Sequence, residues 1–184
     1  EQLRQRVTGI ARSRGVELSG LDVLVITSPV LRLDLPRDQA LLMKSIEKHQ
    51  PRILLLDPLV RLHRLDENNA KDISGFLGYL RELQRSFGVA VVLTHHSSKR
   101  GSSRPGQALR GSSDLHAVGD SNLYLSRQGD DIDVTVEHRS AMAIAPFRVR
   151  LNSADPKSTH LICVGKTEVS AESTKGDISS QILE

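Results

Sequence analysis

Two nearly continuous apolar runs, separated by one long amphipathic segment, limit what this chain can fold into. The runs are RILLLDPL at residues 52–59 and GVAVVLTHHS at residues 88–97. Apolar runs without alternation are typical of parallel strands that helices cover on both faces. Parallel strands need a crossover connection, which is right-handed in almost all proteins. The pattern therefore predicts an α/β fold with a mostly parallel sheet flanked by helices.

The segments around these runs extend the same alternation. The crossover helix is expected from about residue 69 to residue 87, since its apolar residues recur at three- and four-residue steps and Gly88 follows as a cap. A second helix is expected from Pro36 to about Lys48, because proline fits the first turn of a helix. The β-branched run at residues 21–30 predicts a further buried strand.

The second half of the chain has a different pattern. Residues 98–113 are rich in glycine, serine and arginine, a composition typical of a loop. Shorter strands are expected at residues 121–128, 131–139 and 146–151, with an edge strand from His160 to Val164. The polar turn QGDD between the first two strands favours antiparallel hairpins.

Domain boundaries follow from these segments. We expect one core domain over residues 1–166, a polar linker at 167–176, and the start of a further helix or domain at 177–184. The chain begins at Glu1 with a charged, helix-like sequence that has neither a methionine nor a helix cap. We therefore expect the core domain to begin upstream of that residue.

Composition sets only loose limits on function. A formal net charge of +3 permits a nucleic-acid partner without requiring one. The single cysteine, Cys163, excludes an intrachain disulfide and favours a reducing, cytoplasmic location. No apolar run approaches the roughly 20 residues that a membrane-spanning helix needs, so no membrane partner is expected.

Asp57 is the first candidate site residue. It directly follows the apolar residues ILLL, and ligands of α/β sheets bind at the carboxyl ends of the strands. A carboxylate at that place suits Mg²⁺ held through water molecules beside nucleotide phosphates. The alternative is a structural carboxylate that caps the turn at Pro58.

His95 and His96 end the next apolar run, at the corresponding edge. An imidazole there can donate a hydrogen bond to a phosphate. A metal site is the alternative, but neighbouring residues of a strand point to opposite faces, so the pair cannot easily chelate one ion. No further cluster of Cys and His with metal-ligand spacing accompanies them.

A resemblance then becomes specific. The ordered series ILLLDPLVRLHRLDENN, VAVVLTHHSSK and LRGSSDLHAVGDSNLYLSR resembles the RepA/DnaB group of hexameric replicative helicases, which are RecA-like P-loop ATPases. The likeness extends over about residues 1–150. It implies a RecA-like core, a homo-oligomeric hexameric ring, and ATP hydrolysis coupled to movement along single-stranded DNA.

The resemblance also implies roles for individual residues. Asp57 would be the Walker B aspartate that organises Mg²⁺, and His95 would sense the γ-phosphate of ATP, with His96 beside it. Arg110 would match the arginine that reaches the nucleotide of the neighbouring subunit, where it neutralises charge in the transition state. Arg139 lies where relatives place a K-x-R pair, although Glu137 replaces the lysine here. For both arginines the alternative is solvation on a loop or hairpin.

Three cations of the loop, Lys99, Arg100 and Arg104, are candidates for contacts with DNA phosphates, which carry no sequence information. No aromatic residue accompanies them, so base stacking is not indicated, and a plain surface linker is the alternative. Asp66, Glu67 and Asn68 also recur in similar ATPases. They either touch the nucleotide or begin the following helix as acidic N-terminal residues.

Two expected parts are missing from the sequence. It contains no G-x-x-x-x-G-K-[ST] loop for the phosphates, and the catalytic glutamate is expected before residue 1. This chain alone is therefore expected to be inactive. Alternatives to a DNA motor are a non-translocating RecA/KaiC-like ATPase switch and a non-catalytic remnant of the fold. Retention of Asp57, His95 and Arg110 argues against a remnant.

Overall fold

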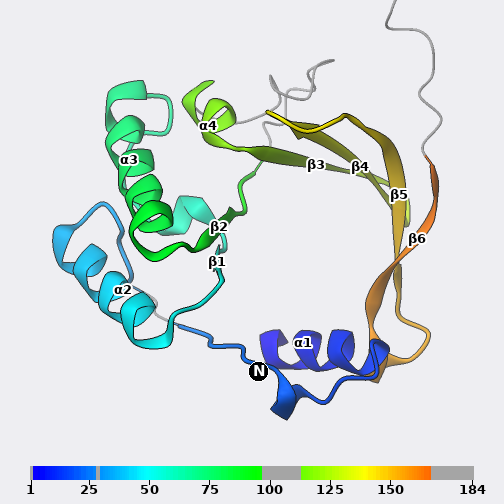
Figure 1. Cartoon of the computed structure of the whole chain (residues 1–184). Coiled ribbons are helices and arrows are strands. Elements are labelled where there is room, and N and C mark those ends of the chain that lie inside the picture. The colour runs from blue at the N-terminus through cyan, green and yellow to red at the C-terminus, as the bar shows by residue number, and fades with distance from the viewer. Residues whose placement is uncertain (1, 28–29, 97–112, 167–184) are drawn as a thin grey trace, which may run out of the picture. The chain divides into compact units, whose positions relative to one another are not determined.

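The computed structural model describes residues 2–27, 30–96 and 113–166, and it contains two compact units (Figure 1). Leu24–Asp120 form the first, which we call the parallel-strand unit. Glu1–Val23 together with Ser121–Glu184 form the second, the antiparallel unit. The candidate residues Asp57, His95 and His96 belong to the parallel-strand unit, and Arg139 belongs to the antiparallel unit.

Helices and two parallel strands alternate in the first unit. Its elements are α2 (Pro36–His49), β1 (Ile53–Leu56), η2 (Leu59–Arg61), α3 (Ala70–Phe87), β2 (Ala90–Leu93) and α4 (Ser113–Val118). The two strands pair in parallel, with Ile53 opposite Ala90 and Leu56 opposite Leu93. The predicted strand–helix–strand crossover is therefore confirmed, although both strands are shorter than their apolar runs.

The crossover helix α3 begins and ends at residues with clear capping roles. The Asn69 side chain accepts a hydrogen bond from the backbone N–H of Lys71 at 3.1 Å, which satisfies one free N–H of the first turn. At the other end Gly88 adopts a left-handed conformation with φ 61°, which a residue with a side chain adopts only with strain. The predicted extent of this helix is confirmed.

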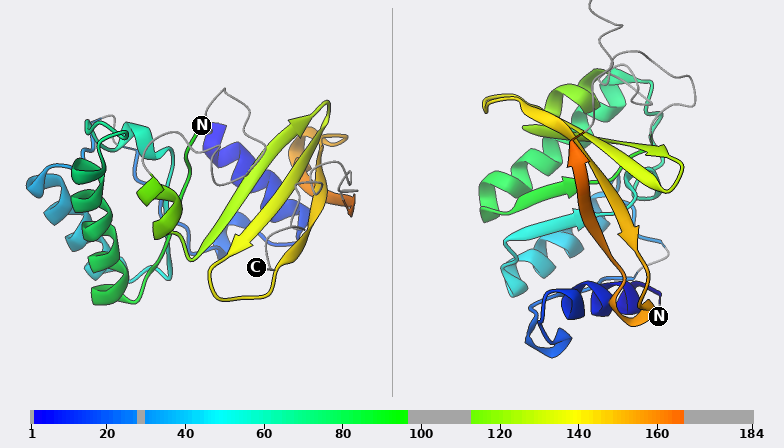
Figure 2. Two further views of the ribbon diagram at one scale, coloured as in Figure 1. Left: turned by 90° about the horizontal axis from the view of Figure 1, so that it is seen from above. Right: turned by 90° about the vertical axis from the view of Figure 1, so that its right-hand side faces the viewer.

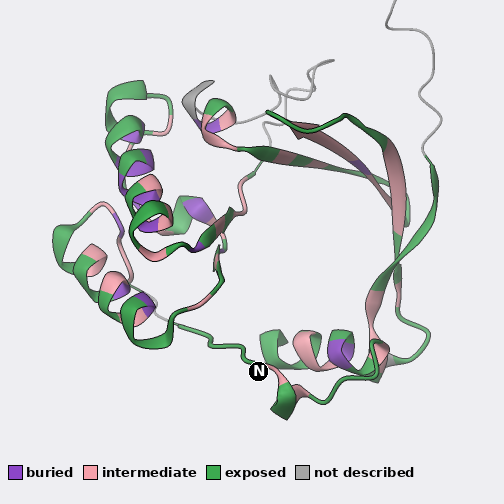
Figure 3. Cartoon of the chain, viewed as in Figure 1, coloured by how far each residue is buried: buried purple, intermediate pink, exposed green. Residues whose placement is uncertain are grey.

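A single hydrophobic core lies between α3, α2 and the inner face of the two strands, and Figure 3 shows the concentration of buried residues on α3. Its most deeply buried side chains are Leu33, Leu59, Ile73 and Leu83. The Tyr79 hydroxyl donates to the Gln39 carbonyl at 3.3 Å and so ties α3 to α2. Burial, and to a lesser extent the nearby Glu82 carboxylate, raises the pKa of Tyr79 to about 12, so this hydroxyl stays protonated.

The strand expected at residues 21–30 is not present in the structure. Residues 21–27 form no strand, and the side chains of Val23, Leu24, Val25 and Ile26 are exposed. The physical reason is that β1 pairs with β2 and no described strand pairs with this segment, so its backbone lacks ladder hydrogen bonds. Composition alone favours a strand, but pairing decides whether one forms.

The second unit contains a four-stranded antiparallel sheet, seen from two further sides in Figure 2. Its strands follow chain order and are β3 (Ser121–Gln128), β4 (Asp131–His138), β5 (Ile144–Asn152) and β6 (His160–Lys166). The helices of this unit are α1 (Gln2–Ser13), η1 (Leu18–Gly20) and η4 (Pro156–Ser158). The predicted hairpins and the expected edge strand are confirmed.

Helix α1 lies close to the backbone of Thr159, the residue that connects η4 to β6. A Cβ atom at Gly9 would lie 3.1 Å from both the backbone nitrogen and the carbonyl oxygen of Thr159, so the close approach favours glycine here. Few side chains are buried in this unit, and Ala11 and Val134 are its buried hydrophobic residues in the described part of the chain.

A mixed α/β fold is therefore confirmed, with a two-stranded parallel sheet and a four-stranded antiparallel sheet. A single core domain over residues 1–166 stays a prediction. The linker and the helix expected at 167–176 and 177–184 lie outside the described residues. Among the helices that the structure describes, none has the length and hydropathy needed to cross a membrane.

Candidate functional site at the ends of the parallel strands

Asp57 and Thr94 meet just beyond the carboxyl ends of β1 and β2. The Thr94 hydroxyl donates a short hydrogen bond to Asp57 Oδ1, and the Thr94 backbone N–H donates to the Leu56 carbonyl at 3.1 Å. The in-register parallel pairing brings these residues together, because both strands end at the same edge. Asp57 is exposed there and can reach a ligand. Thr94 was not among the predicted site residues, although it directly precedes the histidine pair.

His95 follows Thr94 and turns toward the interior of the unit. Its Nδ1 atom lies 3.8 Å from Oε1 of Glu67, whereas His96 is exposed. The two neighbouring histidines therefore have different surroundings. Asp57 and His95 follow adjacent strands, and their roles toward a nucleotide stay predictions.

His63 completes a cluster behind this edge. Its Nε2 atom lies 3.4 Å from the same Glu67 oxygen, and its ring packs against Phe76 with centroids 5.1 Å apart. Burial lowers the pKa of His63, while the nearby carboxylates of Glu67 and Asp34 oppose that shift. The ring is thus neutral at neutral pH and keeps one N–H to donate.

Asp34 lies near His63, in the segment before α2. The Leu33 N–H donates to the Leu62 carbonyl at 2.6 Å and holds the two segments together. Arg64 Nε donates to Asp34 Oδ2 at 3.2 Å. In the part of the chain that the structure describes, no hydrogen bond of normal geometry reaches Asp34 Oδ1, the two His63 ring nitrogens or Glu67 Oε1.

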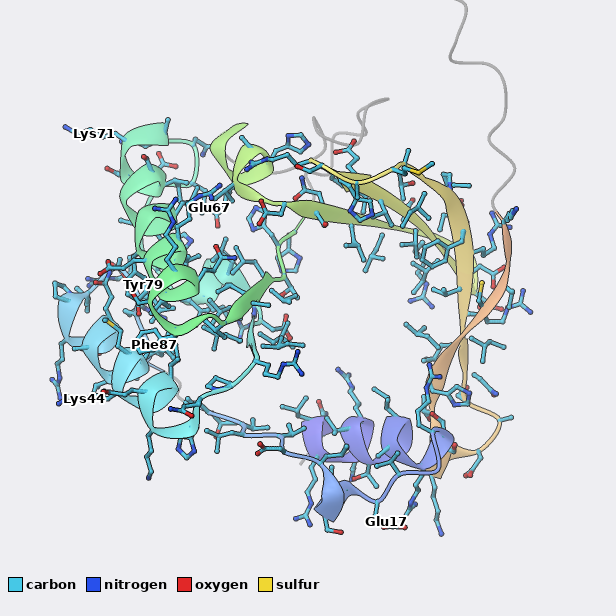
Figure 4. The ribbon with its side chains drawn as sticks, viewed as in Figure 1. Glu17, Lys44, Glu67, Lys71, Tyr79 and Phe87 are labelled. Carbon is cyan, nitrogen blue, oxygen red and sulfur yellow. The ribbon has the colours of Figure 1, made fainter. Side chains whose placement is uncertain are left out.

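The residues of the segment LDENN have different contacts in the structure. Asp66 accepts hydrogen bonds from the backbone and side-chain nitrogens of Asn68, both at 3.0 Å, and Asn69 caps α3. Glu67, labelled beside α3 in Figure 4, instead contacts the two histidines. Of the two roles left open by the sequence, Asp66 therefore fits the helix start and Glu67 fits the site.

Oxygen ligands at the exposed edge suit Mg²⁺. The Asp57 carboxylate, with one oxygen already fixed by the Thr94 hydroxyl, is the hard donor that this ion prefers through bridging water molecules. Within residues 2–27, 30–96 and 113–166, no three His, Cys, Asp or Glu side chains are arranged to hold a metal ion.

Several predicted site residues cannot be placed against this edge. Lys99, Arg100, Arg104 and Arg110 lie outside the described residues. Arg139 is exposed just after β4, in the antiparallel unit.

At the position of the missing lysine, Glu137 accepts a hydrogen bond from the Tyr124 hydroxyl at 3.0 Å. Burial, together with this hydrogen bond, raises the pKa of Tyr124. Glu137 therefore has a structural partner within its own sheet.

Comparison with known families decides the general class. A family model described as an AAA domain matches residues 2–102, which is more than half of the chain. The chain belongs to the AAA domain family. The matched segment includes Asp57, Thr94 and His95 and ends before Arg110. Membership supports an ATPase-type function of the P-loop class, with use of nucleotide and Mg²⁺. A search of curated proteins found no match.

Proposed function

We propose that this AAA domain is part of an ATP-dependent DNA motor, a helicase-type ATPase of DNA replication or repair. In the proposal a homo-hexameric ring with a RecA-like core hydrolyses ATP at its subunit interfaces while single-stranded DNA passes through it. The supporting observation is the contact of Asp57 with Thr94 beside His95, at the shared edge of two parallel strands.

Each residue of this edge has a distinct part in the proposal. Asp57 holds Mg²⁺ through water molecules, and the Thr94 hydroxyl fixes one carboxylate oxygen so that the other faces the ligand. Mg²⁺ supplies charge neutralisation at the phosphates. His95 donates a ring N–H toward the γ-phosphate, with His96 as a second donor at the exposed surface.

The remaining roles fall on residues that the structure does not describe, apart from Arg139. Arg110 stabilises transition-state charge in the neighbouring subunit, and Arg139 is a second cation near the nucleotide. Lys99, Arg100 and Arg104 contact DNA phosphates. The proposal also requires a phosphate-binding loop and a catalytic glutamate from outside residues 1–184.

Native mass spectrometry with Mg-ATP and a short single-stranded oligonucleotide tests this function first. For a polypeptide that also carries the phosphate-binding loop, the expected result is a ring of subunits with bound nucleotide and DNA. Single chains without nucleotide would contradict the proposal for this polypeptide. Rings that hydrolyse ATP equally well with and without DNA would instead favour a non-translocating, RecA/KaiC-like switch.

A further inference from the structure

One carboxylate oxygen of Glu67 lies between two imidazole rings that come from separate segments. Oε1 is 3.4 Å from His63 Nε2 and 3.8 Å from His95 Nδ1. His63 follows η2, Glu67 precedes α3, and His95 follows β2. The side chains of His63, Glu67 and His95 are 1%, 14% and 10% exposed, so His63 is buried and the other two are mostly covered.

The cluster places polar groups where burial disfavours them. Burying a polar group costs stability unless it gains a good partner, and the contacts of His63 and His95 with Glu67 Oε1 are longer than a typical hydrogen bond. Apolar side chains would pack against Phe76 without that cost. Violations of local packing rules are expected at functional sites.

The chemistry of imidazole suggests what the contact does. The two ring nitrogens point away from each other, so a ring with Nδ1 toward Glu67 directs Nε2 away from that carboxylate. The partner of one nitrogen also selects which nitrogen carries the proton. At 3.8 Å the contact is longer than a hydrogen bond, as is common for catalytic groups before the ligand binds.

We propose that Glu67 is a positioning residue for His95. Its carboxylate keeps a proton on Nδ1 of the His95 ring and directs Nε2 toward the ligand edge, while His63 contacts the same carboxylate oxygen. Only the purpose of the outward Nε2 depends on the proposed function. The positioning itself is a property of the chain without nucleotide.

Histidine ¹⁵N NMR on the nucleotide-free chain at neutral pH tests the proposal. The wild-type His95 signals should show the Nδ1–H tautomer, and Glu67→Ala should convert them to the Nε2–H tautomer that dominates in free histidine. Asp66→Ala is the matched control, because it removes the adjacent carboxylate, which contacts Asn68 instead. It should leave the His95 tautomer unchanged.

A His95 tautomer that is the same in wild type and Glu67→Ala would overturn the proposal. If Glu67→Ala does not fold, Glu67→Asp keeps the charge but withdraws it by one methylene, and unchanged His95 signals in that variant would overturn it equally. Failure of the proposed function is separately visible in a longer polypeptide that also carries the phosphate-binding loop: it would bind no Mg-ATP, although its His95 tautomer still depends on Glu67.

Discussion

The two units differ in how completely their polar side chains are hydrogen-bonded. On the antiparallel sheet, Arg148 donates to both oxygens of Asp133, at 2.6 and 3.1 Å, and Arg150 donates to both oxygens of Asp131, at 2.5 and 3.0 Å. These carboxylates have complete partners on the neighbouring strand, although their side chains are about as little exposed as that of Glu67. Cross-strand pairs of this kind serve the sheet itself.

The parallel-strand unit shows the reverse arrangement. Its polar groups His63, Glu67 and Asp34 are enclosed beside a large hydrophobic core, and several of their atoms lack hydrogen bonds of normal geometry in the described chain. The unit therefore has ample apolar burial to offset a costly polar cluster. Within the described residues, incomplete hydrogen bonding, rather than the number of charges, distinguishes the candidate site from the antiparallel sheet.

The sharpest test of this contrast compares two aspartates. Asp57→Ala in the ring-forming protein should lower ATP turnover at least about 100-fold, since it removes the carboxylate that fits Mg²⁺. Asp133→Ala, which breaks an ion pair of the antiparallel sheet, should leave turnover near wild type. Steady-state ATPase rates, with circular dichroism to check folding, measure both. Equal losses of ATP turnover in the two variants would remove the functional distinction between the units.

Core substitutions give the next largest effect. Leu83→Ala should destabilise the protein by about 2–5 kcal/mol, because Leu83 is fully buried on α3 and a cavity would remain. Val134→Ala is the matched change on β4, where fewer methyl groups are lost and few other side chains are buried. Val134→Ala should lower the free energy of unfolding, measured with urea, by less than Leu83→Ala does. A larger loss for Val134→Ala would show that the antiparallel unit carries more of the stability than its burial indicates.

The pattern of apolar residues predicted most elements of both units. The spacing of apolar residues and the capping residues predicted α3, and polar turns predicted the hairpins, because these signals are local in the sequence. The prediction of a strand at residues 21–30 was wrong, since a β-branched run does not specify a pairing partner.

For the site, the ends of the apolar runs indicated Asp57 and His95. His63 and the inward direction of Glu67 were missed, because the contacts of both depend on how separate segments pack. The one available signal was Glu67 in LDENN, whose two possible roles only the structure distinguishes.

The buried histidine predicts a pH dependence of folding. Burial lowers the pKa of folded His63 below its ordinary value near 6.5, so the unfolded chain binds more protons in the range between the two values. Stability from this group is complete above pH 6.5 and falls as pH decreases below it, by at most about 1.4 kcal/mol per pH unit.

The variant His63→Leu isolates this contribution. Urea unfolding between pH 7 and pH 5 should show a flatter pH profile for the variant than for wild type. Superimposable profiles would mean that the His63 ring is protonated as easily in the folded state as in the unfolded state, and the contrast between the units would weaken.

The smallest effect is expected from the ion pairs of the antiparallel sheet. The hydrogen bond from Arg150 lowers the pKa of Asp131, so Arg150→Ala should return that pKa toward its ordinary range, as followed by NMR titration of the carboxyl carbon. The pair's contribution is present at neutral pH and is lost as pH falls below about 4.

Thermal unfolding of the same variant decides what these pairs do for the fold. Solvent and salt screen an exposed pair, so at neutral pH the variant should melt close to wild type, and added salt should reduce the difference further. The matched control is Arg127→Ala on β3, whose side chain contacts the Gly129 carbonyl instead of a carboxylate. A large decrease in melting temperature that added salt does not change, seen in Arg150→Ala but not in Arg127→Ala, would show that ion pairs stabilise this sheet more than strand pairing does. Complete polar pairing would then be a stabilising device in one unit, while the incomplete pairing around Glu67 would remain a cost in the other.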